Sequence, residues 1–227
     1  VPGDPVRQLD WRVSARTGKP HIKEYEAMKR IPSWLVVDTS ESMFVQSTAL
    51  SKHGLAVWLA AALGLVALRR LSPVAIVSGG DRPGDTRPSL LRGRLWNGLD
   101  RMRLRLAPEP TMIAEVIQDL AMRSSQRGLF VVISDLHAPG VLHALKLTAQ
   151  RHDVVVLQPI DPAEASGAPA GLFRAAEAET GQSFLASSGA GWLDSEQGFG
   201  PELAGAGVDH IALPTNADVI TPLQRFL

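Results

Sequence analysis

Five side chains with hard oxygen atoms stand at the ends of expected strands or at the start of an expected helix: Asp38, Ser40, Ser42, Thr111 and Asp135. Alternate residues of an extended segment point to the same side, so the first three would present one carboxylate and two hydroxyls to a single point. Oxygen ligands without His or Cys suit Mg²⁺, or else Mn²⁺ or Ca²⁺. The sequence therefore predicts a divalent-metal site with a position left open for an outside ligand.

The same residue types also have a purely structural use. Asp and Ser side chains turn the chain and cap helices, and Thr111, which follows a proline, is an ordinary helix N-cap candidate. This alternative stays open from the residues alone. We favour the metal site because the pattern falls at the ends of two expected core strands. We also expect Asp135 to lie at the surface rim of the domain.

The elements that must position these residues alternate between strands and helices. Apolar runs at 34–37, 74–77, 129–133 and 154–157 are typical of buried strands, and helical patterns cover 51–70, 95–103, 111–120, 139–151 and the chain from 218. This order indicates an α/β fold with a doubly wound, mainly parallel sheet and helices on both faces. Ligands of such sheets bind at the carboxyl ends of the strands.

Weaker patterns complete the expected organisation. Short strands are expected near Leu90 and at 183–186, and residues 9–13 and 21–25 read as an N-terminal β-hairpin around a turn at 17–20. We expect one domain over residues 1–227, with residues 1–30 packed on it as an extension.

Composition narrows the function classes. Lys plus Arg equals Asp plus Glu at 23 each, and the arginine-rich stretch from Arg82 to Arg105 holds a single aromatic residue, so we expect no nucleic-acid partner. The chain has no cysteine, which fits a reducing, cytoplasmic location. Its longest apolar run, 55–68, is too short to cross a bilayer, so we expect no membrane span in this chain. The start at Val1 looks truncated, which leaves an upstream membrane segment open.

The five oxygen-bearing residues resemble the metal-ion-dependent adhesion site of von Willebrand factor A domains. In that family the two serines and the threonine ligate the metal directly or through water, and the aspartates act mostly through water. The resemblance implies these roles for Ser40, Ser42, Thr111, Asp38 and Asp135. It also implies a Rossmann-like fold and a carboxylate from a partner that completes the metal's shell.

A second resemblance covers nearly the whole chain. Residues 3–12 (GDPVRQLDWR), 14–16 (SAR), 161–164 (DPAE) and 179–181 (ETG) are similar to the signature of a bacterial branch, the domain of unknown function 58 family with its MxaS-like members. Members of this branch are typically encoded beside MoxR-type AAA+ ATPases. The resemblance implies such an ATPase as partner, in a chaperone-like assembly that matures another enzyme or inserts a metal into it.

An enzyme is the competing hypothesis. Asp38 at a strand end resembles the nucleophile of Mg²⁺-dependent phosphotransferases and hydrolases of the haloacid dehalogenase type. Those enzymes carry a second Asp two residues later as the acid and base, whereas Ser40 stands there in this chain. A serine does not replace that carboxylate. We therefore expect a binding module without catalytic residues.

Overall fold

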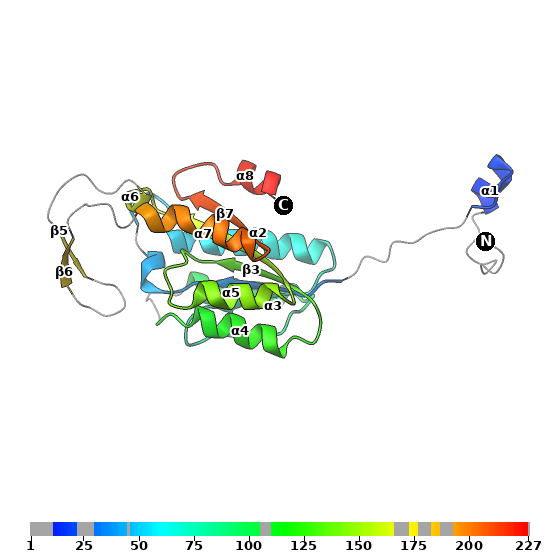
Figure 1. The fold of residues 1–227 in the computed structure, drawn as a ribbon. Helices are drawn as coiled ribbons and strands as arrows, with labels where there is room; N and C mark the ends of the chain where they lie inside the picture. Colours follow the sequence, from blue (N-terminus) through cyan, green and yellow to red (C-terminus); the bar gives the residue numbers. More distant parts are fainter. Residues whose placement is uncertain are drawn as a thin grey trace. The chain divides into compact units, whose positions relative to one another are not determined.

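The computed structural model describes residues 11–21, 30–44, 46–104, 110–165, 173–176, 183–186 and 193–226. The chain divides into two compact units, Val1–Arg30 and Ile31–Leu227. All described elements except α1 belong to the second unit (Figure 1). The expected packing of residues 1–30 on the domain stays a prediction.

The described part of the first unit is helical, which corrects the predicted β-hairpin. Helix α1 spans Trp11–Thr17, where a strand was expected. The Thr17-Gly18 segment, read as a hairpin turn, ends this helix instead: the Gly18 N–H donates to the Ser14 carbonyl oxygen at 2.9 Å, and Gly18 has a φ of 68°. A glycine in the left-handed region commonly terminates a helix. Residues 22–25, the expected hairpin partner, lie outside the described residues.

Five parallel strands form the sheet of the second unit, and four of them lie at the apolar runs that predicted strands. The strands are β1 (Ser33–Val37), β2 (Val74–Ser78), β3 (Leu129–Ile133), β4 (Asp153–Ile160) and β7 (Val208–Pro214), in the order β2-β1-β3-β4-β7. The edge strand β7 was not anticipated. The runs at β1 and β2 are buried along their whole length, as is usual for a parallel sheet covered on both faces.

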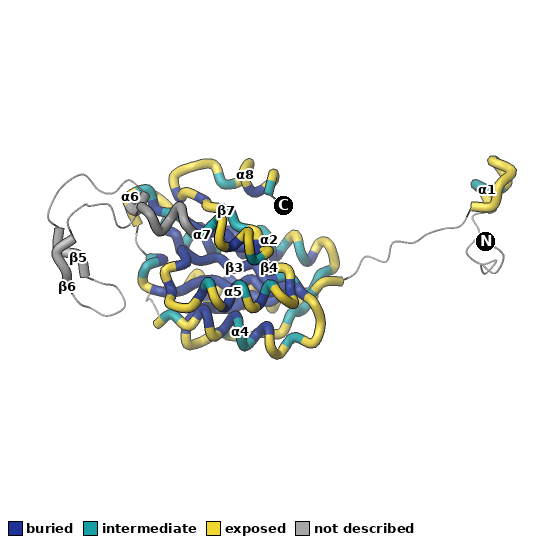
Figure 2. The backbone as a smooth tube through the Cα atoms, in the orientation of Figure 1, coloured by how far each residue is buried: buried dark blue, intermediate teal, exposed yellow. Residues whose placement is uncertain are grey.

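Helices cover both faces of this sheet. Odd residues of β1 and β3, such as Leu35 and Val131, belong to one apolar cluster, whereas even residues such as Val36 and Val132 belong to the other. The first cluster takes in α2 (Lys52–Arg69), α3 (Arg92–Arg103) and α8 (Ile220–Phe226), and the second takes in α4 (Ile113–Arg123), α5 (Val141–Ala149) and α7 (Leu193–Gly205). Figure 2 shows the strands as a buried layer beneath more exposed helices.

Helix α2 lies in this layered core. By length and composition it could cross a membrane. Its side chains Leu55, Leu59 and Ala60 are nevertheless buried against the sheet with at most 1% exposed surface. One face of α2 is thus buried, as its apolar sequence predicted, whereas Trp58 and Val66 on the same helix are 45% and 49% exposed.

The remaining elements are short. They are the 3₁₀ helix η2 (Glu41–Phe44), α6 (Pro162–Ala165), β5 (Phe173–Ala176) and β6 (Ser183–Ala186). The strand expected at 183–186 is confirmed, and it pairs with β5 in a separate antiparallel sheet. Near Leu90 the structure has only an isolated bridge between Val74 and Ser89 in place of the expected strand.

The strand order reverses at β1, because β2 lies on one side of it and β3 on the other. The Asp38 N–H donates to the Ile133 carbonyl oxygen at 2.9 Å, which joins the carboxyl ends of β1 and β3. A reversal of this kind opens a crevice at the carboxyl edge, and ligands of open α/β sheets bind there. Asp38 and Asp135 both follow strands that end at this point.

Candidate metal centre

The Asp38 carboxylate is held by two donors at the end of β1. Asp38 is fully buried. Its Oδ1 accepts a hydrogen bond from the Ser40 N–H at 2.9 Å, and its Oδ2 accepts one from the Ser134 hydroxyl at 2.5 Å. The first bond closes a local turn, as expected if Asp38 has a purely structural role. The second comes from the end of β3, so it orients the carboxylate at the reversal point.

The two predicted serines lie together. Their hydroxyl oxygens, Ser40 Oγ and Ser42 Oγ, are 3.0 Å apart. Ser42 reaches this position from the 3₁₀ helix η2 rather than from an extended segment. The predicted convergence of the two hydroxyls is therefore present, although the backbone achieves it differently.

Backbone hydrogen bonds bring the Thr111 loop to the same edge. The Gly79 N–H donates to the Val37 carbonyl oxygen at 2.7 Å, and the Gly79 carbonyl oxygen accepts from the Met112 N–H at 2.8 Å. A Cβ atom on Gly79 would meet the Ile113 side chain at 3.0 Å, so a larger residue here would press against the start of α4. Thr111 is thus tied through Gly79 to the end of β1.

Thr111 does not cap α4, which corrects the expectation of an N-cap. The N-cap residue is Met112, and it makes no side-chain capping bond. The Thr111 hydroxyl oxygen is shielded from solvent and has no hydrogen-bond partner among the described residues. A buried hydroxyl without a partner costs stability, and such groups in native proteins usually serve a ligand or a water.

Asp135 is buried rather than placed at a surface rim. It follows β3 with 2% of its surface exposed. Its Oδ2 accepts from the Lys52 ammonium at 2.8 Å, and its Oδ1 accepts from the His137 N–H at 3.3 Å. The His137 ring lies beside the same carboxylate, with Nδ1 at 3.5 Å from Oδ2. The site therefore contains a fixed positive charge that its five predicted residues do not include.

Lys52 is the functional residue that the sequence analysis missed. It is the first residue of α2 and has no exposed surface. A signal was present, because Lys52 is the only charged residue between Ser51 and Leu68. A lone charge at the start of a core helix that points to the ligand-binding edge is a candidate site residue, since buried charges are normally paired.

The pKa values of the two carboxylates are shifted in opposite directions. Burial, together with the nearby charge of Asp135, raises the pKa of Asp38 to about 6. Burial also acts to raise the pKa of Asp135, but the contact with the His137 side chain and the charge of Lys52 outweigh it and bring the pKa below its usual range. The charge of Asp135 thus acts on Asp38, so the two carboxylates lie near one another.

A third buried aspartate, Asp161, follows the neighbouring strand β4. Its Oδ2 accepts from the Ser47 N–H at 2.8 Å, and its Oδ1 accepts from the Ser47 hydroxyl and from the Ala163 N–H, the latter at 2.9 Å. These bonds outweigh the effect of burial and lower the pKa of Asp161. We call these three residues the Asp161 corner, and the five predicted residues the Asp38 corner.

The donors of the Asp38 corner fit a hard divalent cation. Three hydroxyls and two carboxylates meet at one edge, and the Thr111 hydroxyl lacks a protein partner among the described residues. Within that part of the chain no group of three or more His, Cys, Asp or Glu side chains could hold a metal, so any metal here depends on hydroxyl ligands. Such a site suits Mg²⁺ better than a soft metal.

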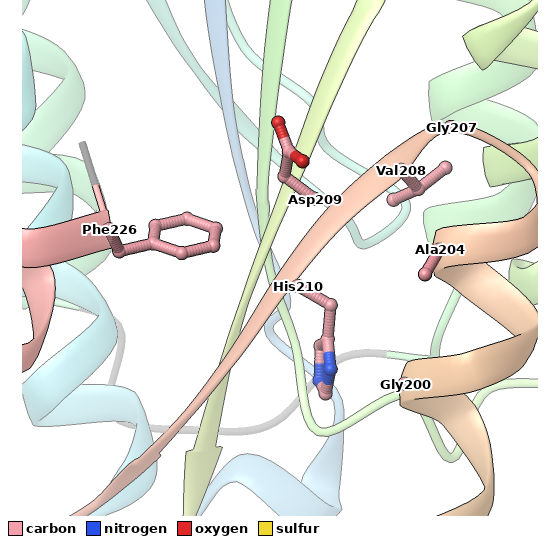
Figure 3. Close-up of a pocket in the computed structure, with 7 residues that line it drawn as sticks. All are labelled: Gly200, Ala204, Gly207, Val208, Asp209, His210 and Phe226. Atoms are coloured by element: carbon pink, nitrogen blue, oxygen red, sulfur yellow. The ribbon is translucent and has the colours of Figure 1, made fainter.

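The described residues also line a cavity of about 320 Å³ beside the edge strand β7 (Figure 3). Its polar groups, Asp209 and His210, point to opposite sides of the strand. His210 Nε2 lies 2.8 Å from Gln158 Oε1, and Gln158 Nε2 donates to the Asp135 carbonyl oxygen at 3.3 Å. Through Gln158, His210 is thus linked to the backbone of Asp135. The polar groups that line the cavity do not converge on a ligand.

Comparison with known proteins gives a family, two relatives and a fold. A family model described as "Protein of unknown function DUF58" matches residues 1–189. Uncharacterized proteins of Mycobacterium bovis and Mycobacterium tuberculosis are 29% identical, over 100% of this chain and 75% of their own length. The crystal structure of an aerotolerance-related membrane protein from Bacteroides fragilis superposes with a TM-score of 0.54 at 18% identity, covering 86% of this chain and 95% of that one. This last likeness concerns the fold alone.

Proposed function

The chain belongs to the DUF58 family, and on that premise we propose that its domain is a von Willebrand factor A-like module that binds a partner protein through a divalent metal. The module works by binding and not by catalysis. The partner we propose is a MoxR-type AAA+ ATPase, in an assembly that matures another enzyme or inserts its metal.

One observation carries this proposal. The Thr111 hydroxyl is buried without a partner among the described residues, and it does not cap the helix that it precedes. The structural alternative gives Thr111 no task, whereas a metal ligand would satisfy its oxygen. The parallel sheet, its reversal at β1 and the pair of serine hydroxyls support the same assignment.

The hydrogen bonds divide the roles within the site. Both oxygens of each aspartate already accept a hydrogen bond, from Ser40 and Ser134 on Asp38 and from Lys52 and His137 on Asp135. The three hydroxyls of Ser40, Ser42 and Thr111 are then the direct ligands, and the aspartates act through water. A bound Mg²⁺ would supply a Lewis acid for an anionic oxygen of the partner.

The charges at the site favour an acidic partner group. With a divalent cation present, Asp38 and Asp135 supply two negative charges, and the cation and Lys52 supply three positive ones. The loaded site thus has one unbalanced positive charge. A carboxylate of the ATPase is the complementary ligand, because hard cations prefer anionic oxygens.

The phosphotransferase alternative receives less support. A nucleophilic carboxylate needs a free oxygen for attack and an acid–base partner. Asp38 Oδ1 and Oδ2 both accept hydrogen bonds, and the position two residues later is Ser40. We therefore propose no catalytic residue. We also place the domain in the cytoplasm, where an AAA+ partner would meet it and where a chain without cysteine is at no disadvantage.

Capture of a MoxR-type AAA+ ATPase tests the proposal. We expect the wild-type protein to retain the ATPase with Mg²⁺ and to lose it with EDTA. Ser42→Ala should lose it in both conditions, with a deficit on the order of 2–5 kcal/mol, as for removing one side of a charged contact. Ser47→Ala, in the Asp161 corner, is the matched control and should behave as wild type. Equal capture by EDTA-treated and Mg²⁺-loaded protein would exclude the Asp38 corner as the docking point.

A further inference from the structure

We propose that Lys52 is a built-in cation of the Asp38 corner, which competes electrostatically with the metal and sets its affinity. This inference rests on the proposed metal site. Lys52 contacts Asp135 and is completely buried, so it would act on the metal through that carboxylate and not by contacting another protein.

The contact between Lys52 and Asp135 is direct. The ammonium nitrogen lies 2.8 Å from Asp135 Oδ2, and the two side chains expose 0% and 2% of their surface. At such burial a charge is only weakly screened by solvent, so the ammonium affects any other cation that the same carboxylate serves. A metal at the Asp38 corner would share Asp135 with Lys52.

Lys52 also stabilises the site without metal. Asp38 and Asp135 are buried near one another, and their repulsion contributes to the raised pKa of Asp38. The ammonium neutralises Asp135 and also lowers the pKa of Asp161 in the neighbouring corner. It is held at the N-terminus of α2, where Ser51 accepts a hydrogen bond from the Gly54 N–H at 3.0 Å and fixes the first turn.

Two consequences follow from one charge. Without metal, Lys52 keeps Asp135 paired, so the fold does not depend on the cation. With metal, Lys52 adds a positive charge that weakens cation binding and leaves the loaded site positive for an anionic partner. The residue therefore favours a reversible metal over a permanently bound one.

Calorimetric titration of metal-free protein with Mg²⁺ tests this inference on Lys52→Met, which keeps a long apolar stem and removes the charge. We expect Mg²⁺ to bind this variant about tenfold more tightly than wild type or better, because a nearby like charge has gone. Its melting temperature without metal should fall by roughly 10 °C, and Mg²⁺ should restore more of it than in wild type. A purely structural lysine would give weaker or unchanged binding.

Lys146→Met is the matched control. Lys146 pairs with Glu202 at the surface, where the two side chains expose 37% and 47% of their area. Removing this exposed charge should leave both the Mg²⁺ affinity and the melting temperature close to wild type. A comparable change in this control would show that any lost lysine has the effect, and would overturn the inference.

A double variant covers the case in which Lys52→Met does not fold without metal. Lys52→Met with Asp135→Asn removes both charges of the buried pair, and such neutral replacements often fold well. A folded double variant, together with rescue of the single variant by Mg²⁺, supports the inference. An unfolded double variant would make Lys52 a packing residue and overturn it.

The outcomes also separate this inference from the proposed function. If wild type binds Mg²⁺ and folded Lys52→Met binds it no more tightly, the role of Lys52 is wrong and the metal site stands. If neither protein binds Mg²⁺, the proposed metal site itself fails, and this inference fails with it.

Discussion

The carboxyl edge of the sheet holds three buried aspartates, and two of them, Asp38 after β1 and Asp161 after β4, each accept a hydrogen bond from a serine hydroxyl. The carboxylate of the Asp161 corner has three donors from Ser47 and Ala163, and its pKa is lowered. The carboxylate of the Asp38 corner has a pKa raised to about 6. Its neighbour Thr111 keeps a buried hydroxyl without a partner among the described residues.

The difference shows that residue type alone does not mark a binding site. Asp and Ser side chains build both corners, but only one of them satisfies its polar groups internally. A fully bonded buried carboxylate stabilises the fold, whereas a crowded carboxylate beside an unpaired hydroxyl costs stability. Proteins retain such destabilising groups mainly where ligand binding offsets the lost stability. The following changes test whether the two corners differ in this way.

Asp135→Ala should have the largest effect, because it leaves the Lys52 ammonium buried without its carboxylate. Breaking one side of a buried ion pair costs about 3–5 kcal/mol of unfolding free energy. Denaturant unfolding of the metal-free variant should show this loss, and titration should show no Mg²⁺ binding. An unchanged unfolding midpoint would mean that Asp135 is not held as the structure shows, and would return it to the surface rim that its sequence position suggested.

Asp161→Asn should come next and should act on stability alone. The amide keeps one accepting oxygen for the three donors, so we expect a loss of about 2 kcal/mol near neutral pH. Folding lowers the pKa of Asp161, so the ionised carboxylate stabilises the folded protein at pH values above the pKa that Asp161 has in the unfolded chain. This stabilisation is lost as the pH falls below about 4. Wild type and variant should converge in acid, while their Mg²⁺ affinities stay equal. Weaker Mg²⁺ binding by Asp161→Asn would show that the Asp161 corner belongs to the metal site.

Asp38→Asn should stabilise the metal-free protein, in contrast to the two preceding variants. A raised folded pKa means that the contribution of Asp38 is favourable below about pH 4 and is lost as the pH rises through about 6. The neutral variant avoids that loss, so it should be more stable than wild type by about 1–2 kcal/mol at pH 8. The gap should close toward pH 4, and Mg²⁺ binding should disappear. A destabilised variant at pH 8 would mean that Asp38 is as well satisfied as Asp161.

The fold and most of the Asp38 corner were predictable because both depend on local signals. Buried parallel strands are short apolar runs, and the polar residues that follow them must gather at one edge. The edge strand β7 was missed because its sequence, VDHIALP, mixes polar residues into a partly exposed strand. The helix α1 was predicted as a strand because the alternation of Trp11 and Val13 is too short to distinguish the two-residue period of a strand from the period of a helix.

Contacts between distant segments could not be predicted. Lys52 and Asp135 are 83 positions apart, and only the path of α2 beneath the sheet edge brings them together. The same holds for Ser47 and Asp161, which are 114 positions apart. Whether a buried hydroxyl has a partner also depends on such contacts, so the contrast between the two corners needed the structure.

Thr111→Val should have the smallest effect, and its sign is the most informative. Valine has nearly the shape of threonine and removes a buried hydroxyl that has no described partner. The metal-free variant should therefore gain about 0.5–1 kcal/mol of stability, because the desolvated oxygen no longer opposes folding. Its Mg²⁺ affinity should fall, and Thr111→Ser, which keeps the hydroxyl, should bind Mg²⁺ nearly as wild type does. Thr39→Val is the matched control, because the Thr39 hydroxyl lies 3.0 Å from the Ser78 hydroxyl and its removal should cost about 1 kcal/mol. If Thr111→Val is destabilised as much as Thr39→Val, the Thr111 hydroxyl has a partner in the folded protein and the Asp38 corner is satisfied without metal.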